Sequence, residues 1–316
     1  MDDQLKYLNE LTWSYRASRV LQIAVKIRLF TALSGNEYST ERLAELCSAK
    51  SDMLQKLLIA CCAMGFVKRA NGLYQNSDLA ENYLVEGKPL YQGDIISHAA
   101  NVWDFWNDLP DQISTNPLPK DETQSHKNFI LGMKNITLGG RGKIFTDNID
   151  LSGKKRMLDV GGGPGTYSIL ACQKYPELTA AVFDLPPTVA IAQDEIKQAG
   201  LQDRILTIPG NWETDNLGSG YDVVLFSNVL HGGETPTLMK LRKAYESMEP
   251  NGMVVIQEFL LNNKKTGPLI PALFNIMVGA FSEQEIKDVI LNAGFKFPEL
   301  VADNQQIGCT WITAVK

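Results

Sequence analysis

Apolar residues in the first sixty positions recur at the spacing of an α-helix. Leu21, Val25 and Leu29 lie four residues apart, and loop-forming residues interrupt this pattern twice. Residues that favour the start of a helix follow the interruptions, at Ser39 and Ser51. The pattern therefore predicts a small helical domain.

After Gly65 the period of the apolar residues changes to two. The dipeptide Asn71-Gly72 separates two short runs with this period, at 66–69 and 73–75. An Asn-Gly pair between such runs is the strongest short signal for a β-hairpin. Helix, turn, helix and hairpin follow one another in the order of a winged helix, so DNA binding is one interpretation of this domain.

The charge of this domain argues against DNA. Residues 1–94 hold 11 Lys and Arg and 11 Asp and Glu, and no basic stripe marks the second helix of the pair. DNA-binding proteins neutralise phosphates with Lys and Arg. A packing or dimerisation module is therefore favoured, and a DNA-binding regulator with a metabolite-sensing second domain stays open as an alternative.

Residues 95–150 are predicted to be helical and are unusually aromatic, with a Pro-rich loop at 115–122. The large apolar side chains here and in a later segment are either core residues or the wall of an apolar substrate pocket between domains. The candidates are Trp103, Trp106, Phe129, Met133, Phe274 and Met277.

From residue 151 onward short apolar strands alternate with helical segments. This alternation predicts an α/β fold with a doubly wound, mainly parallel sheet that helices cover on both faces. Ligands of such sheets bind beyond the carboxyl ends of the strands, where the strand order reverses. The predicted strands lie at 156–162, 179–186, 204–210, 221–230 and 252–261.

A glycine run follows the first of these strands. Gly161 and Gly163 allow a ligand to approach the backbone, but a dinucleotide fingerprint would require glycine where Thr166 stands. Asp159, inside the strand, suits a cationic ligand, such as a nucleoside with an amino-acid tail and a positive sulfonium. Asp184, at the end of the second strand, is placed to accept both ribose hydroxyls. A tight turn with a surface aspartate is the simpler alternative.

The third strand ends in Gly210-Asn211-Trp212, which offers a flexible turn, an amide and an indole. Such a group can hold adenine by hydrogen bonding and stacking. A loop with a packed tryptophan is the other interpretation.

The fourth strand ends in Ser227, and His231 follows at the ligand edge of the sheet. An unperturbed imidazole, with a pKa of about 6.5, accepts a proton near neutral pH. Glu258, at the corresponding depth of the next strand, is predicted to orient that ring. A lone histidine is more often structural, which is the prediction for His98 and His126.

The composition limits the cellular setting. The 316 residues carry a net charge of −6 and are 44% hydrophobic and 21% charged, which excludes a disordered chain and disfavours nucleic acid or a membrane as partner. Five cysteines without a CxxC pair and three histidines predict no metal site. An acidic N-terminus and the lack of an apolar run of about 20 residues predict a cytoplasmic protein.

These motifs together resemble a family of class I methyltransferases dependent on S-adenosylmethionine. The family comprises the plant caffeic acid and bacterial small-molecule O-methyltransferases. The resemblance extends over nearly the whole chain and includes LLIACCAMGFVKRANGLYQNSDLAENYL, LDVGGGPG, VFDLP, PGNW, SNVLHGGE and VIQEF. It implies a winged-helix dimerisation domain at 1–94, a helical bridging segment lining the substrate pocket at 95–150, and an S-adenosylmethionine-binding catalytic domain at 151–316.

The resemblance also implies roles for single residues. By position, Gly161, Gly163, Asp184, Asn211 and Trp212 fall on the family's cofactor residues. The predicted cofactor site also includes Asp159, Leu185, Gly210 and Ser227. His231 falls on the family's general base and Glu258 on its orienting carboxylate. The product would be S-adenosylhomocysteine, and the protein would form a homodimer through its N-terminal domain.

Three departures from the plant members are visible. Asn211 stands where aspartate is usual, Gly232 follows the predicted base instead of aspartate, and the loop near Ala280 is shortened. That loop carries the plant enzymes' second supporting glutamate, and Glu283 is the residue that would replace it. The sequence predicts methyl transfer to a hydroxyl of a small aromatic or polyketide-like acceptor. Transfer to N, S or C, or another reaction with the same cofactor, remains an alternative.

Overall fold

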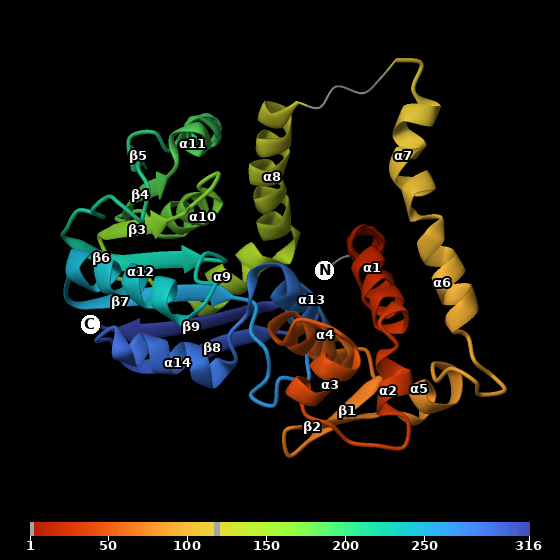
Figure 1. Cartoon of the computed structure of the whole chain (residues 1–316). Coiled ribbons are helices and arrows are strands. Elements are labelled where there is room, and N and C mark those ends of the chain that lie inside the picture. Colours follow the sequence, from red (N-terminus) through yellow and green to blue (C-terminus); the bar gives the residue numbers. More distant parts are fainter. Residues whose placement is uncertain (1–2, 117–120) are drawn as a thin grey trace. The chain divides into compact units, whose positions relative to one another are not determined.

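The computed structural model describes residues 3–116 and 121–316 (Figure 1). Its internal contacts divide the chain into two compact units. The N-terminal unit contains the first described range together with 261–278, and the sheet unit contains 121–260 and 279–316.

The segment 95–150, expected to bridge two domains, is itself divided between these units. Its part before residue 117 groups with the N-terminal unit, and its part from Asp121 groups with the sheet unit. The Pro-rich loop expected at 115–122 includes residues 117–120, which lie outside the described residues.

Helices and one hairpin make up the N-terminal unit. The hairpin turn is formed by Asn71 (φ 50°) and Gly72 (φ 82°), as a type I′ turn requires, and Val67 pairs with Asn76 across the two strands. The predicted hairpin is thus confirmed. In chain order the elements are α1 (Asp3–Lys26), α2 (Leu29–Leu33), α3 (Thr40–Leu46), α4 (Ser51–Ala63), β1 (Val67–Ala70), β2 (Leu73–Asn76), α5 (Asp78–Tyr83), α6 (Gly93–Asn101), α7 (Trp103–Ile113) and α13 (Leu269–Val278).

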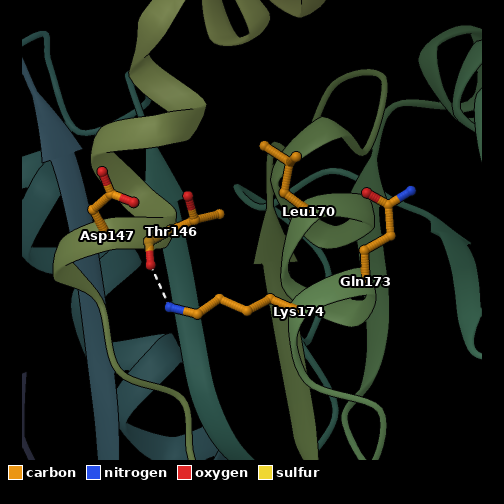
Figure 2. Close-up of a pocket in the computed structure, with 5 residues that line it drawn as sticks. All are labelled: Thr146, Asp147, Leu170, Gln173 and Lys174. Atoms are coloured by element: carbon orange, nitrogen blue, oxygen red, sulfur yellow. Dashed lines mark hydrogen bonds between the residues drawn. The ribbon is translucent and has the colours of Figure 1, made fainter.

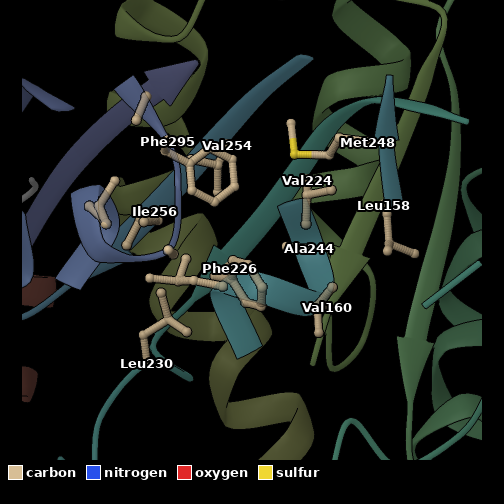
Figure 3. Close-up of a cluster of buried hydrophobic side chains, with 14 of the residues drawn as sticks. Leu158, Val160, Val224, Phe226, Leu230, Ala244, Met248, Val254, Ile256 and Phe295 are labelled. Carbon is tan, nitrogen blue, oxygen red and sulfur yellow. The ribbon is translucent and has the colours of Figure 1, made fainter. Parts of the chain in front are cut away.

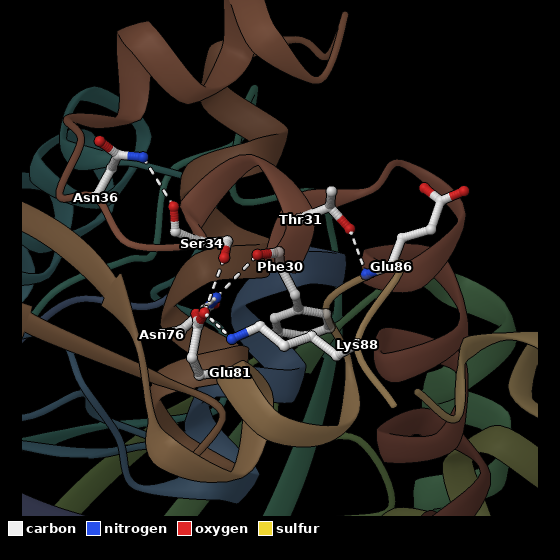
Figure 4. A network of polar contacts seen from close by, with 8 residues as sticks. All are labelled: Phe30, Thr31, Ser34, Asn36, Asn76, Glu81, Glu86 and Lys88. Carbon is white, nitrogen blue, oxygen red and sulfur yellow. Dashed lines mark hydrogen bonds and ion pairs between the residues drawn. The ribbon is translucent and has the colours of Figure 1, made fainter. Parts of the chain in front are cut away.

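A polar network centred on Glu81 joins α2, β2 and α5 (Figure 4). The Glu81 carboxylate accepts hydrogen bonds from Ser34 Oγ at 2.8 Å, Asn76 Nδ2 at 2.8 Å and Lys88 Nζ at 2.9 Å. Asn76 Nδ2 also donates to the Phe30 carbonyl oxygen. These bonds, that of Asn76 first, lower the pKa of Glu81 to about 2. The network therefore stabilises the unit chiefly while Glu81 is ionised.

The sheet unit has seven strands in the order β5-β4-β3-β6-β7-β9-β8. The first five are parallel, and β9 runs antiparallel to both of its neighbours. The predicted mainly parallel sheet is confirmed. The elements are α8 (Glu122–Ile136), the π-helix η1 (Thr137–Arg141), α9 (Gly142–Asn148), β3 (Arg156–Val160), α10 (Thr166–Lys174), β4 (Thr179–Asp184), α11 (Pro186–Gln198), β5 (Ile205–Pro209), β6 (Tyr221–Ser227), α12 (Glu234–Ser247), β7 (Met248–Glu258), α14 (Glu283–Asn292), β8 (Lys296–Asn304) and β9 (Cys309–Val315).

Alternate residues of each strand enter opposite faces of this sheet. Val224 and Phe226 pack with residues of α12 and α14 (Figure 3), whereas Val223 and Leu225 pack with residues of α9, α10 and α11. Helices thus cover both faces, which explains why the strands read as continuous apolar runs. The carboxyl ends of β3 and β6, which are neighbours, remain as the edge where loops meet.

The two C-terminal strands were not predicted from the sequence. Strand β9 lies between β7 and β8, so the last strand in the chain is not the last strand in the sheet. Within the described residues no helix has the length and apolar character needed to cross a membrane.

Candidate active site

The glycine run forms the turn between β3 and α10. The backbone N–H of Gly161 donates to the Phe183 carbonyl oxygen at 2.8 Å, which joins the turn to β4. Gly163 is itself buried, but among the described residues beyond its two chain neighbours no atom lies within 4 Å of the position that a Cβ would take there. A small space therefore lies beside Gly163, and its use by a ligand stays a prediction.

Asp159 lies beneath this turn and is 1% exposed. Its Oδ2 accepts a hydrogen bond from Ser168 Oγ at 2.9 Å, and its Oδ1 is buried without a hydrogen-bond partner in the described part of the chain. Burial, assisted by the negative charge of Asp184, raises the pKa of Asp159 to about 7. A buried carboxylate oxygen without a partner is suited to a cationic or hydrogen-bond-donating ligand.

Asp184 is the last residue of β4, and its carboxylate is hydrogen-bonded to the glycine turn. Its Oδ2 accepts from the Gly163 N–H at 2.8 Å, and its Oδ1 accepts from the Leu185 N–H at 2.7 Å. Each carboxylate oxygen has a second lone pair, so the group can accept further hydrogen bonds. Asp184 and Leu185, both predicted cofactor residues, thus lie beside the glycine turn.

The loop after β5 brings Trp212 to the same turn. A Cβ placed on Gly161 would lie 2.5 Å from Cζ3 of Trp212, so the indole lies directly against the glycine backbone. Asn211 is used within its own loop, since its Oδ1 accepts from the Glu213 N–H at 2.9 Å. Gly210 packs against the Phe183 ring in the same way. The structure therefore brings this predicted adenine-side group next to the glycine turn.

His231 and Glu258 lie together at the ends of β6 and β7. His231 Nδ1 is 3.9 Å from Glu258 Oε1, which is longer than a hydrogen bond. Glu258 is 3% exposed, and its Oε1 accepts from the Leu230 N–H at 2.7 Å. The imidazole stacks on the Phe259 ring at 6.0 Å, and Nδ1 is buried without a hydrogen-bond partner among the described residues. Nδ1 thus faces the carboxylate, with the ring held by stacking.

Ser227 and Glu283 are held by partners of their own. Ser227 Oγ donates to Gln257 Oε1 at 2.9 Å at the carboxyl end of β6. Glu283 Oε1 pairs with Lys287 Nζ at 2.5 Å, one turn later on α14. The shortened loop before α14 does approach the residue after His231, since a Cβ on Gly279 would lie 3.6 Å from Gly232 N. A supporting role for Glu283 stays a prediction.

The six predicted pocket residues lie on helices of both units. Trp103 is covered by the Arg19 guanidinium, 5.0 Å from its ring centroid, and Phe274 contacts the ring of Trp13 at 5.8 Å. On α8 Phe129 is 61% exposed, and His126, predicted to be structural, lies 3.3 Å from Thr188 Oγ1. The others are Trp106 and Met277, which are exposed, and Met133, which is half-buried. Their role in a pocket stays a prediction.

A surface depression of about 710 Å³ lies elsewhere, between α9 and the second half of α10 (Figure 2). Lys174 crosses it to donate to the Thr146 carbonyl oxygen. The residues around it are Thr146, Asp147, Leu170, Gln173 and Lys174. Since α10 runs away from the glycine turn, this depression is not at the carboxyl edge of the sheet.

Residues of α12 were missed by the sequence analysis. Lys240 and Lys243 donate to backbone carbonyls of the loops that carry His231 and Trp212, and Thr237 donates to the Leu230 carbonyl oxygen. The only sequence signal was their position on the helix that follows His231. The described residues contain no group of three or more His, Cys, Asp or Glu side chains able to hold a metal ion.

Comparison with known proteins identifies the family. Residues 113–296 match the O-methyltransferase domain family, and residues 9–86 match the O-methyltransferase dimerisation domain. The 3-hydroxy-5-methyl-1-naphthoate 3-O-methyltransferase of Streptomyces sahachiroi is 30% identical over 306 residues, which cover 91% of this chain and 88% of that protein. The L-tyrosine C(3)-methyltransferase of Streptomyces lavendulae is 37% identical over 134 residues, 42% of this chain and 36% of that protein.

A solved structure supports the same assignment. It is an O-methyltransferase family 2 protein from Planctomyces limnophilus in complex with apigenin, with a TM-score of 0.85 and 25% identity over 99% of this chain and 96% of that one. The fold class, the dimerisation domain and the cofactor class predicted from the sequence are thereby confirmed. The chain belongs to the S-adenosylmethionine-dependent O-methyltransferase family.

Proposed function

We propose that this enzyme transfers a methyl group from S-adenosylmethionine to a hydroxyl of a small aromatic or polyketide-like acceptor, with His231 as the general base. The observation that carries the proposal is the position of His231, with Nδ1 directed at a buried carboxylate 3.9 Å away. His231 follows β6, and β6 is the neighbour of the strand that leads into the glycine turn.

The residues around the glycine turn fit this cofactor. A Cβ on the buried Gly163 would meet no described atom within 4 Å beyond its chain neighbours, and the Asp159 Oδ1 atom is a buried acceptor without a partner among the described residues. Asp184 would hold the ribose hydroxyls, and Trp212 would stack on the adenine. When bound, S-adenosylmethionine supplies a methyl group on a positively charged sulfur.

The role of His231 follows from the chemistry of a phenol. A phenolic hydroxyl, with a pKa of about 10 as in tyrosine, is mostly protonated at pH 7. Because Nδ1 faces Glu258, Nε2 is the nitrogen left to take the proton from the acceptor. The buried Glu258 carboxylate then stabilises the imidazolium and keeps the ring oriented.

Two relatives guide the choice of acceptors. The Streptomyces sahachiroi relative is named as an O-methyltransferase of a hydroxynaphthoate, and the Planctomyces structure is a complex with apigenin. The match to a tyrosine C(3)-methyltransferase makes transfer to carbon the second candidate. The test is a screen of hydroxylated aromatic and quinonoid acceptors, including both of these, for formation of S-adenosylhomocysteine by the purified protein.

The site of methylation separates the two candidates. An O-methyl product, identified by mass and by NMR, is the expected result. A C-methyl product would overturn the hydroxyl acceptor but keep the family reaction, and no product with any acceptor would contradict the proposed substrate class.

Replacing the base tests its role. His231→Ala is expected to lower kcat by about 10²–10⁴-fold, the usual contribution of general-base catalysis, with little change in the Kd for S-adenosylhomocysteine. His98→Ala is the matched control, because His98 is an exposed histidine on α6. Unchanged turnover in His231→Ala would remove this residue from the mechanism.

We also propose that the enzyme is a homodimer through its N-terminal domain. Helix α1 exposes a row of apolar side chains, Tyr7, Leu8, Leu11 and Tyr15, each at least 50% exposed. A second copy of the chain would cover them. Leu8→Asp together with Leu11→Asp is expected to convert the dimer to monomer in sedimentation velocity, and a wild-type monomer would contradict the proposal.

The cytoplasmic location stays a prediction.

A further inference from the structure

Three side chains hold the backbone just before the proposed base. The Val229 carbonyl oxygen accepts from Lys240 Nζ at 2.7 Å, and the Leu230 carbonyl oxygen accepts from Thr237 Oγ1 at 3.2 Å. The Leu230 N–H donates to Glu258 Oε1 at 2.7 Å. Two of these three side chains come from α12, so this helix fixes the backbone that carries the imidazole.

Lys240 has a second contact, on the proposed cofactor side. Its Nζ lies 4.5 Å from the centroid of the Trp212 ring, which is a cation–π geometry. Trp212 and Val229 in turn both lie against Gly161, where a Cβ would be 2.5 Å from Trp212 Cζ3 and 2.9 Å from Val229 Cγ1. One ammonium group therefore touches both loops that converge on the glycine turn.

The side chain of Lys240 is half-buried beside charged groups. Burial lowers its pKa, and this effect outweighs the opposing negative charges of Glu258 and Glu213. Lys243, one turn further along α12, donates to the carbonyl oxygens of Trp212, Glu213 and Asp215. Lys243 thus holds the backbone of one loop, whereas Lys240 connects the two.

We propose that Lys240 is a positioning residue that couples the Trp212 seat of the cofactor to the loop carrying His231. The inference rests on the proposed function for the roles of those two residues. Methyl transfer requires the acceptor oxygen, the methyl carbon and the sulfur to lie in line, and small errors of position slow such steps strongly. A cation that holds the cofactor seat and the base together limits those errors.

The test compares three single variants of the full chain. Lys240→Met removes the charge and both contacts, and Lys240→Arg keeps a group that can donate to a carbonyl and stack on an indole. Arg242→Met removes a cation from the exposed face of the same helix and is the matched control. Thermal melting confirms that each variant is folded.

Two measurements need no methyl acceptor. Calorimetry gives the Kd for S-adenosylhomocysteine, which Lys240→Met is expected to raise by about tenfold, within the usual strength of a cation–π contact. NMR gives the imidazole C–H resonances of the three histidines, assigned by His→Ala variants. Lys240→Met is expected to move only the His231 resonance, and Lys240→Arg is expected to restore both values in large part.

A double variant separates the two contacts. In a Trp212→Leu background the ring is absent, so Lys240→Met should no longer change the Kd for S-adenosylhomocysteine. The shift of the His231 resonance should persist, because it depends on the Val229 carbonyl.

The inference is overturned if Lys240→Met matches Arg242→Met in both measurements, or if Lys240→Arg is as defective as Lys240→Met. An effect on the Kd that persists without Trp212 would also overturn it. Wild-type protein that fails to bind S-adenosylhomocysteine would instead contradict the proposed function. The two failures are therefore distinguishable.

Discussion

Two glycines of the same turn offer a direct test of the site. Gly161 (φ 66°) and Gly163 (φ 56°) both have a left-handed backbone, which disfavours any residue with a Cβ. They differ in their surroundings: a Cβ on Gly161 would lie 2.5 Å from the Trp212 ring and 2.9 Å from Val229, whereas a Cβ on Gly163 would meet no described atom within 4 Å. Gly163→Ala is thus a matched control for Gly161→Ala.

The expected difference in stability follows from these contacts. The left-handed backbone costs an alanine about 1–2 kcal/mol at either position, so this contribution cancels in the comparison. Overpacking adds about 1–3 kcal/mol at position 161 alone. Relief by side-chain movement is limited, because Trp212 is held by Lys240 and Val229 is β-branched. Gly161→Ala should therefore be less stable than Gly163→Ala by about 1–3 kcal/mol.

Thermal unfolding followed by circular dichroism measures this difference. For a unit of this size it corresponds to a Tm lower by roughly 2–12 °C in Gly161→Ala than in Gly163→Ala. Gly163→Ala should stay folded, but calorimetry should show a higher Kd for S-adenosylhomocysteine than in the wild type, because the added Cβ occupies the proposed ligand space. Equal Tm values for the two variants, or a less stable Gly163→Ala, would refute the reasoning.

Three further predictions concern single carboxylates. Burial raises the pKa of Asp159 to about 7, so the free energy of unfolding should fall as pH rises from about 4 to 7. Asp159→Asn should abolish this fall, measured by unfolding in urea. Hydrogen bonds lower the pKa of Glu81 to about 2, so its contribution to the free energy of unfolding is complete above about pH 4.5 and is lost as pH falls toward 2. Glu81→Gln should lower the free energy of unfolding by about 1–2 kcal/mol at pH 7, and the stability of this variant should depend less on acid pH. Glu258→Gln should lower kcat by at least about tenfold and leave the Kd for S-adenosylhomocysteine unchanged, and equal activity would show that this carboxylate does not support His231.

Much of the fold was predictable because its signals are local. The Asn71-Gly72 turn and the alternation of strands and helices after residue 151 depend on residues close in sequence, and the structure has them as predicted. The glycine turn is of the same kind, since the backbone angles at Gly161 and Gly163 are those that glycine permits. Local preference and burial pattern together specify such elements.

The C-terminal strands show where local signals fail. Strand β9 lies between β7 and β8 and runs antiparallel to both, so the last strand of the chain occupies an inner position and β8 forms the edge of the sheet. Which strands pair in this way depends on contacts between residues far apart in the sequence, and the residues of one strand do not specify it.

The candidate site likewise has features that the sequence predicts and features that depend on contacts between distant residues. The sequence by itself determined the residue types at the ends of β3, β4, β5 and β6, and hence the cofactor class and the proposed base. Only the tertiary structure decided that Asp159 Oδ1 is buried without a described partner, that Glu283 pairs with Lys287, and that Lys240 joins two loops. The physical reason is that hydrogen bonding, ion pairing and burial depend on distances between side chains, which folding sets among residues far apart along the chain.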